Sequence, residues 1–355
     1  MKLLVLYEEL AGYFMACISK FTDLYDVEVF IIHKEINAND APFEINKHKK
    51  IELFNRKKYN EEQLMDIVNK IKPDAIFCGG WNNNSYLKIS HQFVNKIPVI
   101  VGFDNKWTGS LKQNVASLLS PVLIKNKFNL CWVPGELQKK YALKLGYKEN
   151  QIATGAYSAD YDLFFNQYLK NKHLKTQKFP HCFIYVGRYT QSKGIKDLWQ
   201  AFIELQKETP NDWELWCLGT GDVEPINNSK IKHFGFIQPK DIDRFIKETG
   251  VLVLPSLVEP WGVVVHEYAS AGFPLICSSE VGAASTFLED GVNGYLYKSK
   301  DIGALKNVMK KIISLSNAEL MDMGEKSLAK AKQITPQKWA ETLLSLIKSA
   351  GSVRN

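Results

Sequence analysis

The chain lacks any long apolar run. None of its apolar stretches approaches the ~20 residues that a membrane-spanning helix needs. The opening stretch MKLLVLYEEL reaches Glu8 and Glu9 before the apolar region of a secretion signal could be complete. We therefore expect a buried first strand and a soluble, cytoplasmic protein, with association to the inner face of a membrane left open.

Cysteine is scarce, and no two cysteines form a Cys-x-x-Cys pair. The six residues are scattered, mostly within apolar runs: Cys17, Cys78, Cys131, Cys182, Cys217 and Cys277. This usage is typical of buried thiols in a reducing compartment. It predicts neither a disulfide framework nor a zinc site.

The excess of basic over acidic residues is also small. The 45 basic and 38 acidic residues leave a net charge of +7, too small and too dispersed for a nucleic-acid-binding tract, so we expect no nucleic-acid partner. One local basic cluster, NKHKKIELFNRKK, covers residues 46–58. It is either a solvated face or a patch that attracts anionic lipid head groups and gives peripheral membrane contact.

The length and the order of patterns predict two α/β domains. The 355 residues exceed what one hydrophobic core usually serves, and 45% apolar with 23% charged residues is typical of a globular chain. Apolar strand patterns alternate with amphipathic helical patterns, which predicts doubly wound, Rossmann-like sheets. The expected strands cover 3–7, 27–32, 75–80, 99–103 and 129–134, then 182–187, 213–219, 231–236, 250–256 and 274–278.

The domain limits follow from a change in composition. Residues 166–180 are polar and lysine-rich without sustained periodicity, which predicts a linker between an amino-terminal domain at 1–165 and a second domain at 181–335. Helical patterns cover 61–71, 136–145, 194–208 and a last segment within 336–355. That last helix could pack on either half. The two sheets are expected to face a common cleft, because open α/β sheets bind ligands at the carboxyl ends of their strands.

Two polar segments directly follow expected strands of the second domain. GRYTQSKG (187–194) places Gly187, Arg188 and Lys193 where a strand turns into a helix, so the two cations could hold a phosphate or diphosphate. They could equally be solvated cations on a glycine turn. LGTGD (218–222) contains Gly219, which would let the backbone approach a ligand closely.

Two further segments follow the next strands. HFGFIQPKDI (233–242) carries Phe236 and Ile237, which could pack on a nucleobase or simply line a tight turn. EPWGVVVHE (259–267) places Glu259 before a helix and Glu267 on it, so the two carboxylates would reach different parts of a ligand and accept hydrogen bonds from sugar hydroxyls. The alternative is two surface charges near a helix start. His266 is interpreted as a packing histidine.

Taken in order, these segments resemble a known family. GR(x)4KG, GTG, GFI, EPWGVVVHE, AGFPLI and EVGAASTFLEDGVNGYLY resemble the nucleotide-sugar domain of retaining GT-B glycosyltransferases of family four, the glycosyl transferases group 1. The resemblance covers roughly residues 131–300. It includes GAYSADYDLF, which is similar to the family's Gly-x-x-x-Asp-x-x-x-Phe segment and would run from Gly155 or Ala156 through Asp160 to Phe164.

The resemblance implies roles for the donor-site residues. Arg188 and Lys193 would hold the donor diphosphate, Glu267 would bind the ribose, and Glu259 would bind hydroxyls of the transferred sugar. Backbone groups would meet the sugar and the phosphate at Trp261, Gly262, Val263 and Val264, and Phe236 with Ile237 would flank the base. Neither a metal nor another cofactor is implied, and the Asp-x-Asp pattern at 241–243 is interpreted as helix capping.

The implied activity is a hexosyl transfer with retention at the anomeric carbon. The donor would be a UDP- or GDP-linked sugar, and the acceptor a saccharide or lipid-linked saccharide in surface-polysaccharide or glycolipid assembly. Two alternatives stay open: a nucleotide-sugar epimerase with the same fold, and a bilobal sugar-binding protein without catalysis.

The amino-terminal half departs from the family pattern. Only Gly12 follows the first strand where a glycine pair is usual, and Phe103 with Asp104 stands where a histidine–aspartate pair is expected. Asp104 either orients a hydroxyl of the acceptor or donor, or caps a turn. Trp81 and Asn82 follow another strand and would either contact the acceptor or form a simple turn.

Overall fold

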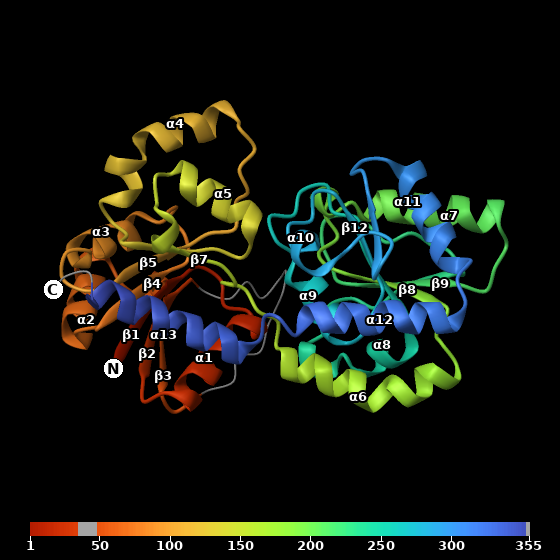
Figure 1. Ribbon diagram of the computed structural model, residues 1–355, viewed down its shortest axis with the longest axis horizontal. Helices are drawn as coiled ribbons and strands as arrows, with labels where there is room; N and C mark the ends of the chain where they lie inside the picture. The colour runs from red at the N-terminus through yellow and green to blue at the C-terminus, as the bar shows by residue number, and fades with distance from the viewer. Residues whose placement is uncertain (35–47, 353–355) are drawn as a thin grey trace. The chain divides into compact units, whose positions relative to one another are not determined.

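The computed structural model describes residues 1–34 and 48–352, and these residues form two compact units (Figure 1). The first unit contains residues 1–34, 48–158 and 336–352, and the second contains residues 159–335. The chain therefore leaves the first unit between Ser158 and Ala159 and returns to it with its last helix.

The first unit is built on a parallel seven-stranded sheet in the order β3-β2-β1-β4-β5-β6-β7. Its strands are β1 (Lys2–Tyr7), β2 (Glu28–His33), β3 (Ile51–Asn55), β4 (Ala75–Cys78), β5 (Val99–Gly102), β6 (Leu130–Trp132) and β7 (Ile152–Ala153). Its helices are α1 (Gly12–Leu24), α2 (Glu61–Ile71), α3 (Asn84–Phe93), α4 (Leu111–Ser120), α5 (Glu136–Lys144) and α13 (Pro336–Ser352), with short turns η1 (Arg56–Lys58), η2 (Pro121–Lys125) and η3 (Glu149–Gln151).

Helices cover both faces of this sheet because the strand side chains alternate. Leu3 and Val5 of β1 point into the cluster that α1 and α13 complete, whereas Leu4 and Leu6 point into the cluster that α2, α3 and α5 complete. Trp339 of α13 donates its indole N–H to the carbonyl of Ala156 at 2.8 Å, which fixes the last helix on the first of these faces. Both faces are therefore buried, as near-continuous apolar strands require.

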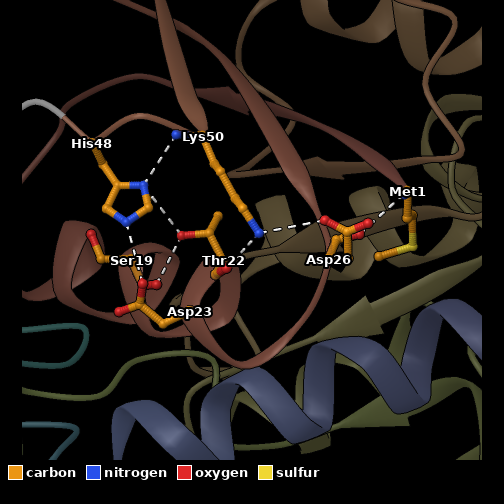
Figure 2. A network of polar contacts seen from close by, with 7 residues as sticks. All are labelled: Met1, Ser19, Thr22, Asp23, Asp26, His48 and Lys50. Carbon is orange, nitrogen blue, oxygen red and sulfur yellow. Dashed lines mark hydrogen bonds and ion pairs between the residues drawn. The ribbon is translucent and has the colours of Figure 1, made fainter.

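A polar network joins the carboxyl end of α1 to the segment before β3 (Figure 2). The imidazole Nε2 of His48 lies 3.3 Å from a carboxylate oxygen of Asp23, and its Nδ1 lies 3.4 Å from the hydroxyl of Thr22. The ammonium of Lys50 donates to the carbonyl of Thr22 at 3.4 Å and lies 3.5 Å from a carboxylate oxygen of Asp26. Two basic residues of the 46–58 cluster are thus paired within the unit, while residues 46 and 47 lie outside the described residues.

The second unit contains a parallel six-stranded sheet in the order β10-β9-β8-β11-β12-β13. Its strands are β8 (Cys182–Val186), β9 (Glu214–Leu218), β10 (Ile231–His233), β11 (Val251–Leu254), β12 (Leu275–Ser278) and β13 (Gly294–Tyr297). Both sheets change direction beside their first strand, so each is doubly wound, and the predicted fold class is confirmed.

Helices lie on both sides of the second sheet as well (Figure 1). α7 (Ile195–Glu208) packs with α11 (Ile302–Ile313) on one side, and α6 (Tyr161–Gln177), α8 (Asp243–Glu248), α9 (Val263–Ser270) and α12 (Asn317–Ala331) contact one another on the other side. The remaining short elements are α10 (Ala284–Phe287), η4 (Gln191–Lys193) and η5 (Pro239–Asp241).

The segment expected to be a linker is helical. Residues 161–177 form α6, whose buried positions Phe164, Tyr168, Asn171 and Lys175 recur at helical spacing. Two of these positions are polar, which concealed the periodicity in the sequence. Asn171 reaches a carboxylate oxygen of Asp243 at 3.5 Å, and the ammonium of Lys175 lies 3.7 Å from the centre of the Phe273 ring.

The other expected elements match with shifts of a few residues, and three strands were not expected. β7 is very short, β3 lies inside the basic cluster, and β13 lies in the GYLY segment of the last motif. β3 is an edge strand that contains Glu52 and has no fully buried position, so it lacks the continuous apolar run of the inner strands. The six cysteines are buried as expected. No helix within residues 1–34 and 48–352 is long and apolar enough to cross a membrane.

Candidate functional site

Four loops of the second unit follow neighbouring strands of one sheet. β8 leads into 187–194, β9 into 219–222, β10 into 234–237 and β11 into 255–262. These strands are adjacent in the order β10-β9-β8-β11, so the loops leave the same edge of the sheet side by side. The four segments that the sequence marked are therefore brought together by the fold.

Hydrogen bonds and a close approach join the first loop to the fourth. The backbone N–H groups of Leu257 and Val258 donate to the carbonyl of Ser192 at 2.8 and 3.1 Å. Gly194 has φ +67°, and a Cβ there would lie 2.2 Å from the carbonyl oxygen of Pro255. Only glycine allows this contact, which sets Lys193 beside the loop that carries Glu259.

A second glycine joins the first, second and third loops. Gly219 has φ +134°, and its N–H donates to the carbonyl of Gly235 at 2.6 Å. A Cβ at Gly219 would lie 1.9 Å from the carbonyl oxygen of Gly187. The glycine of the LGTGD segment thus serves backbone-to-backbone packing within the site.

Lys193 and Glu259 form an ion pair at the junction of their loops. The pair is mostly enclosed, with side-chain exposures of 19% for Lys193 and 11% for Glu259. The Glu259 carboxylate also accepts a hydrogen bond from the hydroxyl of Ser256 at 3.3 Å. The backbone carbonyl of Glu259 accepts from the N–H of Gly282 at 3.0 Å. One oxygen of the Glu259 carboxylate therefore has two partners within its own unit, the ammonium of Lys193 and the hydroxyl of Ser256.

Arg188 is exposed and lies in the same neighbourhood. Its carbonyl accepts a hydrogen bond from the Tyr185 hydroxyl at 2.7 Å. Burial raises the pKa of Tyr185 well above its ordinary value; the Glu259 carboxylate adds to that rise, and the Arg188 guanidinium opposes it. Both charged groups thus act on one buried phenol, and the guanidinium is available to an anion from solvent.

The start of α9 follows the fourth loop, and within the described part of the chain no side chain caps it. Gly262 is the N-cap residue at φ +92° and has no side chain to accept from the first-turn N–H groups of Val263 and Val264. Trp261 is buried, its ring packs edge-on against Phe287, and its carbonyl accepts from the N–H of Ala283 at 2.8 Å. The helix start can meet an anion through its backbone.

Glu267 lies one turn into α9 and is electrostatically strained. Burial, together with the nearby carboxylate of Asp160, raises the pKa of Glu267 from 4.5 to about 7. Asp160 is the N-cap of α6 and accepts from the N–H of Leu163 at 3.2 Å. Any hydrogen-bond donor that contacts such a carboxylate, including a vicinal diol, stabilises its ionised form.

His266 has both ring nitrogens engaged with backbone groups. Nδ1 accepts from the N–H of Ala159 at 2.9 Å, so the neutral ring donates from Nε2 to the carbonyl of Ala331 at 3.0 Å. The ring stacks on Phe287 with 4.2 Å between centroids, and burial lowers its pKa to about 4. His266 is therefore a packing histidine, as expected from the sequence, and its two hydrogen bonds also connect α9 to Ala159 and Ala331.

The third loop supplies apolar side chains. Phe236 and Ile237 directly follow Gly235 and are partly buried. The neighbouring Asp-x-Asp pattern does not cap a helix, because α8 has Ile242 at its N-cap without a side-chain hydrogen bond. Asp243 instead accepts from the ammonium of Lys170 at 2.6 Å. Among residues 1–34 and 48–352, no group of three or more histidine, cysteine or acidic side chains could hold a metal ion.

The first unit contains a tyrosine cluster that the sequence analysis missed. Tyr7 ends β1, Tyr13 lies in the first turn of α1, and Tyr157 comes just before the chain leaves the unit. Burial raises the pKa of each phenol well above its ordinary value, and the Asp104 carboxylate adds to the rise in all three. Tyr13 and Tyr157 both contribute to the shifted pKa of Tyr7.

This cluster gathers groups from separate segments at the carboxyl end of the first sheet. Gly12 is the first residue of α1, next to Tyr13, and Asp104 follows β5. Single tyrosines at a strand end and in a loop carry no sequence signal of their own. The sequence pattern marked Asp104 but did not show that the three tyrosines lie near it.

The remaining acceptor-side candidates lie in the loop after β4. The Trp81 ring packs on Phe103 and Tyr141, with centroid distances of 4.6 and 6.3 Å, whereas Asn82 is exposed. The adjacent Asn83 caps α3 and donates to a carboxylate oxygen of Glu8 at 2.6 Å. Trp81 thus belongs to an aromatic cluster, and Asn82 is accessible to solvent.

The fold is that of GT-B glycosyltransferases. The structure is similar to sucrose-phosphate synthase of Thermosynechococcus elongatus, with a TM-score of 0.75 and 16% identity over 99% of this chain and 100% of that one. It is also similar to Anabaena HepE in complex with UDP, with a TM-score of 0.73 and 15% identity over 98% of this chain and 100% of that one. At such identities the likeness establishes the architecture of the chain.

The sequence of the second unit identifies the family. Residues 166–330 match the sequence model of the glycosyl transferases group 1. The match contains the four loops described above. The family that the ordered motifs resembled is thereby confirmed.

Curated relatives align over part of their length. An uncharacterized glycosyltransferase of Methanocaldococcus jannaschii is 30% identical over 120 residues, which cover 31% of this chain and 30% of that protein. The alpha-monoglucosyldiacylglycerol synthase of Acholeplasma laidlawii is 26% identical over 289 residues, which cover 78% of this chain and 64% of that protein. The chain thus spans between about a third and two thirds of these relatives.

Proposed function

We propose that this protein is a glycosyltransferase that moves a hexose, with retention, from a nucleoside-diphosphate sugar to a saccharide or lipid-linked saccharide acceptor. The observation that carries this proposal is the enclosed Lys193–Glu259 pair beside Arg188 at the start of α9. It joins a cationic group for a diphosphate and a carboxylate for sugar hydroxyls within one loop junction of a glycosyl transferases group 1 domain.

The chemistry of the pair suits both halves of an activated sugar. The ammonium of Lys193 has three donors, of which one satisfies Glu259, so the others can reach phosphate oxygens. As negative charge gathers on the departing diphosphate, Arg188, Lys193 and the amides of Val263 and Val264 stabilise it without a metal ion. Glu259 then positions the sugar through its hydroxyls, and the departing phosphate oxygen takes the acceptor proton.

We assign the nucleotide half of the donor to the remaining residues of the site. Glu267 accepts hydrogen bonds from the ribose diol, which compensates the desolvation of its carboxylate. Phe236 and Ile237 flank the base. We favour a uridine donor over a guanosine one, because the structurally similar HepE was solved in complex with UDP.

The acceptor assignment is supported by the first unit and by one relative. The clustered phenols of Tyr7, Tyr13 and Tyr157 remain protonated donors at neutral pH, and Asp104 is an acceptor beside them, which suits binding of sugar hydroxyls. The Acholeplasma laidlawii relative is a glycolipid synthase by name. We therefore infer a role in surface-polysaccharide or glycolipid assembly, at a membrane surface.

Nucleotide binding provides the test. Thermal shift and calorimetry with UDP, GDP and ADP should show stabilisation by one nucleotide, and Arg188→Ala and Glu267→Ala should each weaken its binding by about tenfold or more. Lys207→Ala, at an exposed position of the same unit on α7, is the matched control. If none of the three nucleotides binds, or if the two site variants bind as the control does, the assignment is wrong.

Turnover separates the alternatives. The protein should be incubated with sugars linked to the nucleotide that binds, together with membrane lipid extracts and saccharides. The reaction should release nucleoside diphosphate and extend an acceptor. An isomer of the donor formed without any acceptor would favour an epimerase. Tight binding with no chemical change under any condition would favour a sugar-binding protein.

A further inference from the structure

The first unit carries an apolar surface where a helix normally carries polar side chains. Six large apolar residues of α4 and η2 are exposed, and we call them the α4 stripe: Leu111, Val115, Leu118, Leu119, Val122 and Leu123. Leu111 and Leu118 are the extremes, with 83% and 80% of their surface exposed. Figure 1 shows α4 on the outer side of the first unit, at the top of the view.

The α4 stripe has the spacing of one helical face. Its members follow each other at i, i+4, i+7, i+8, i+11 and i+12, a pattern that ordinarily faces the protein core. Here the inward positions are Ser120 and Ile124 instead. The hydroxyl of Ser120 donates to the carbonyl of Leu145 at 2.8 Å, which holds the segment with its apolar face outward. Contiguous exposed apolar surface of this kind marks an interaction site.

The charges of the chain segment that contains the α4 stripe are of one sign. Between Asp104 and Glu136 the sequence contains four lysines and no acidic residue: Lys106, Lys112, Lys125 and Lys127. Lys112 is exposed next to Leu111, whereas Lys127 donates to the carbonyls of Val122 and Leu123 at 3.2 and 2.8 Å. A second copy of the chain on this face would bring like charges together, but an anionic lipid surface complements them.

The length of the segment decides how it meets a bilayer. The 10 residues of α4 and the 5 of η2 extend about 22 Å at the helical rise, less than the ~30 Å hydrocarbon core. The segment can therefore lie in the interface with leucines in the acyl boundary and lysines among head groups, but it cannot span.

We propose that the α4 stripe docks the first unit on an anionic lipid surface. This inference concerns α4 and η2 alone and stands apart from the donor site of the second unit. It places membrane contact on α4 and η2 rather than on the 46–58 cluster, where His48 and Lys50 are already paired with acidic side chains of α1 and the turn after it.

Vesicle binding tests the proposal directly. The full chain should sediment with phosphatidylcholine vesicles that contain phosphatidylglycerol, more weakly with phosphatidylcholine alone, and less as salt rises. The double variant Leu111→Gln, Leu118→Gln should partition at least about tenfold less, because two leucines no longer enter the acyl boundary. Lys112→Gln should weaken binding to the anionic vesicles by about fivefold and leave binding to neutral ones unchanged.

Matched variants of the second unit provide the control. Leu169→Gln replaces a leucine of α6 that is 55% exposed, and Lys207→Gln replaces an exposed lysine of α7; neither should change vesicle binding. Melting curves and nucleotide binding of all variants should match the wild type, since the substituted side chains point to solvent. This separates a failed docking surface from a misfolded chain and from a failed donor site.

Two results would overturn the inference. One is vesicle binding by the double leucine variant equal to that of the wild type. The other is a wild-type dimer in sedimentation analysis that the double variant converts to monomer without any vesicle binding by either protein, since the α4 stripe would then be a self-association surface.

Discussion

Replacement of Glu267 by glutamine should reveal a pH dependence that the wild-type protein conceals. The pKa of Glu267 is raised from 4.5 to about 7, so between these pH values the native chain holds a proton that the unfolded chain has lost. The free energy of unfolding therefore falls as pH rises through this window, by about 3 kcal/mol in total. Glutamine does not titrate, so Glu267→Gln removes this loss.

The neighbouring His266 has the opposite effect over nearly the same window. Burial lowers its pKa from 6.5 to about 4, so here the unfolded chain holds the extra proton and the free energy of unfolding rises as pH rises from about 4 to 6.5. The two contributions of about 3 kcal/mol each oppose one another. The wild type should show little net slope from this pair of residues.

The measured quantity is the difference in melting temperature between Glu267→Gln and wild type at pH 5 and at pH 8. The melting temperature of the variant, relative to that of the wild type, should be roughly 6 to 12 °C higher at pH 8 than at pH 5. For a domain of this size, a change of about 3 kcal/mol in the free energy of unfolding corresponds to such a shift. The constant effect of lost hydrogen bonds cancels, because only the change with pH counts. Glu224→Gln, at an exposed position, should give the same difference at both pH values.

A second variant isolates the cause. Asp160→Asn retains a capping oxygen for α6 but removes the carboxylate that helps to raise the pKa of Glu267, so it should narrow the window from its upper end. Equal melting differences for Glu267→Gln at pH 5 and pH 8 would refute the reasoning, because Glu267 would then ionise in the native chain as it does in the unfolded one.

Three further outcomes follow from the contacts of the second unit. Lys193→Met and Glu259→Gln should each lower the free energy of unfolding, measured by urea titration, by about 2 kcal/mol, because each change leaves an enclosed charge without its partner. The double variant should lose clearly less than the sum of the two single losses. Strictly additive losses would contradict the pairing. His266→Ala should cost about 3 kcal/mol through two lost backbone hydrogen bonds and a lost ring stack, with the loss smaller at pH 4 than at pH 7 by thermal denaturation; a loss independent of pH would exclude the buried neutral ring. Gly219→Ala should disturb the packing of the loops that follow β8, β9 and β10, and it should lower the melting temperature far more than Gly291→Ala. Both glycines have positive φ, but of these two only Gly219 lies against another backbone segment. Similar melting temperatures for the two variants would contradict the close approach.

The grouping of the four loops of the second unit could be predicted from the sequence to a large extent. Each of its loops directly follows an apolar strand, and the carboxyl ends of neighbouring parallel strands must lie together. Lys193 and Glu259, which are 66 positions apart, were thus expected near one another, and the structure pairs them. The sequence does not reveal the raised pKa of Glu267, because that rise depends on burial and on Asp160, which precedes α6.

Local apolar periodicity by itself determined the inner strands, the amphipathic helices and the doubly wound class of this protein, because buried strands and two-faced helices require those patterns whatever surrounds them. Only the tertiary structure decided which polar residues are buried and which apolar residues are exposed. Asn171 and Lys175 find partners inside the second unit, so α6 is a helix where composition suggested a linker. Leu111 and Leu118 meet no core at all, so a stripe with a core-like pattern lies at the surface. Burial is a property of what other segments supply, and no window of sequence contains that information.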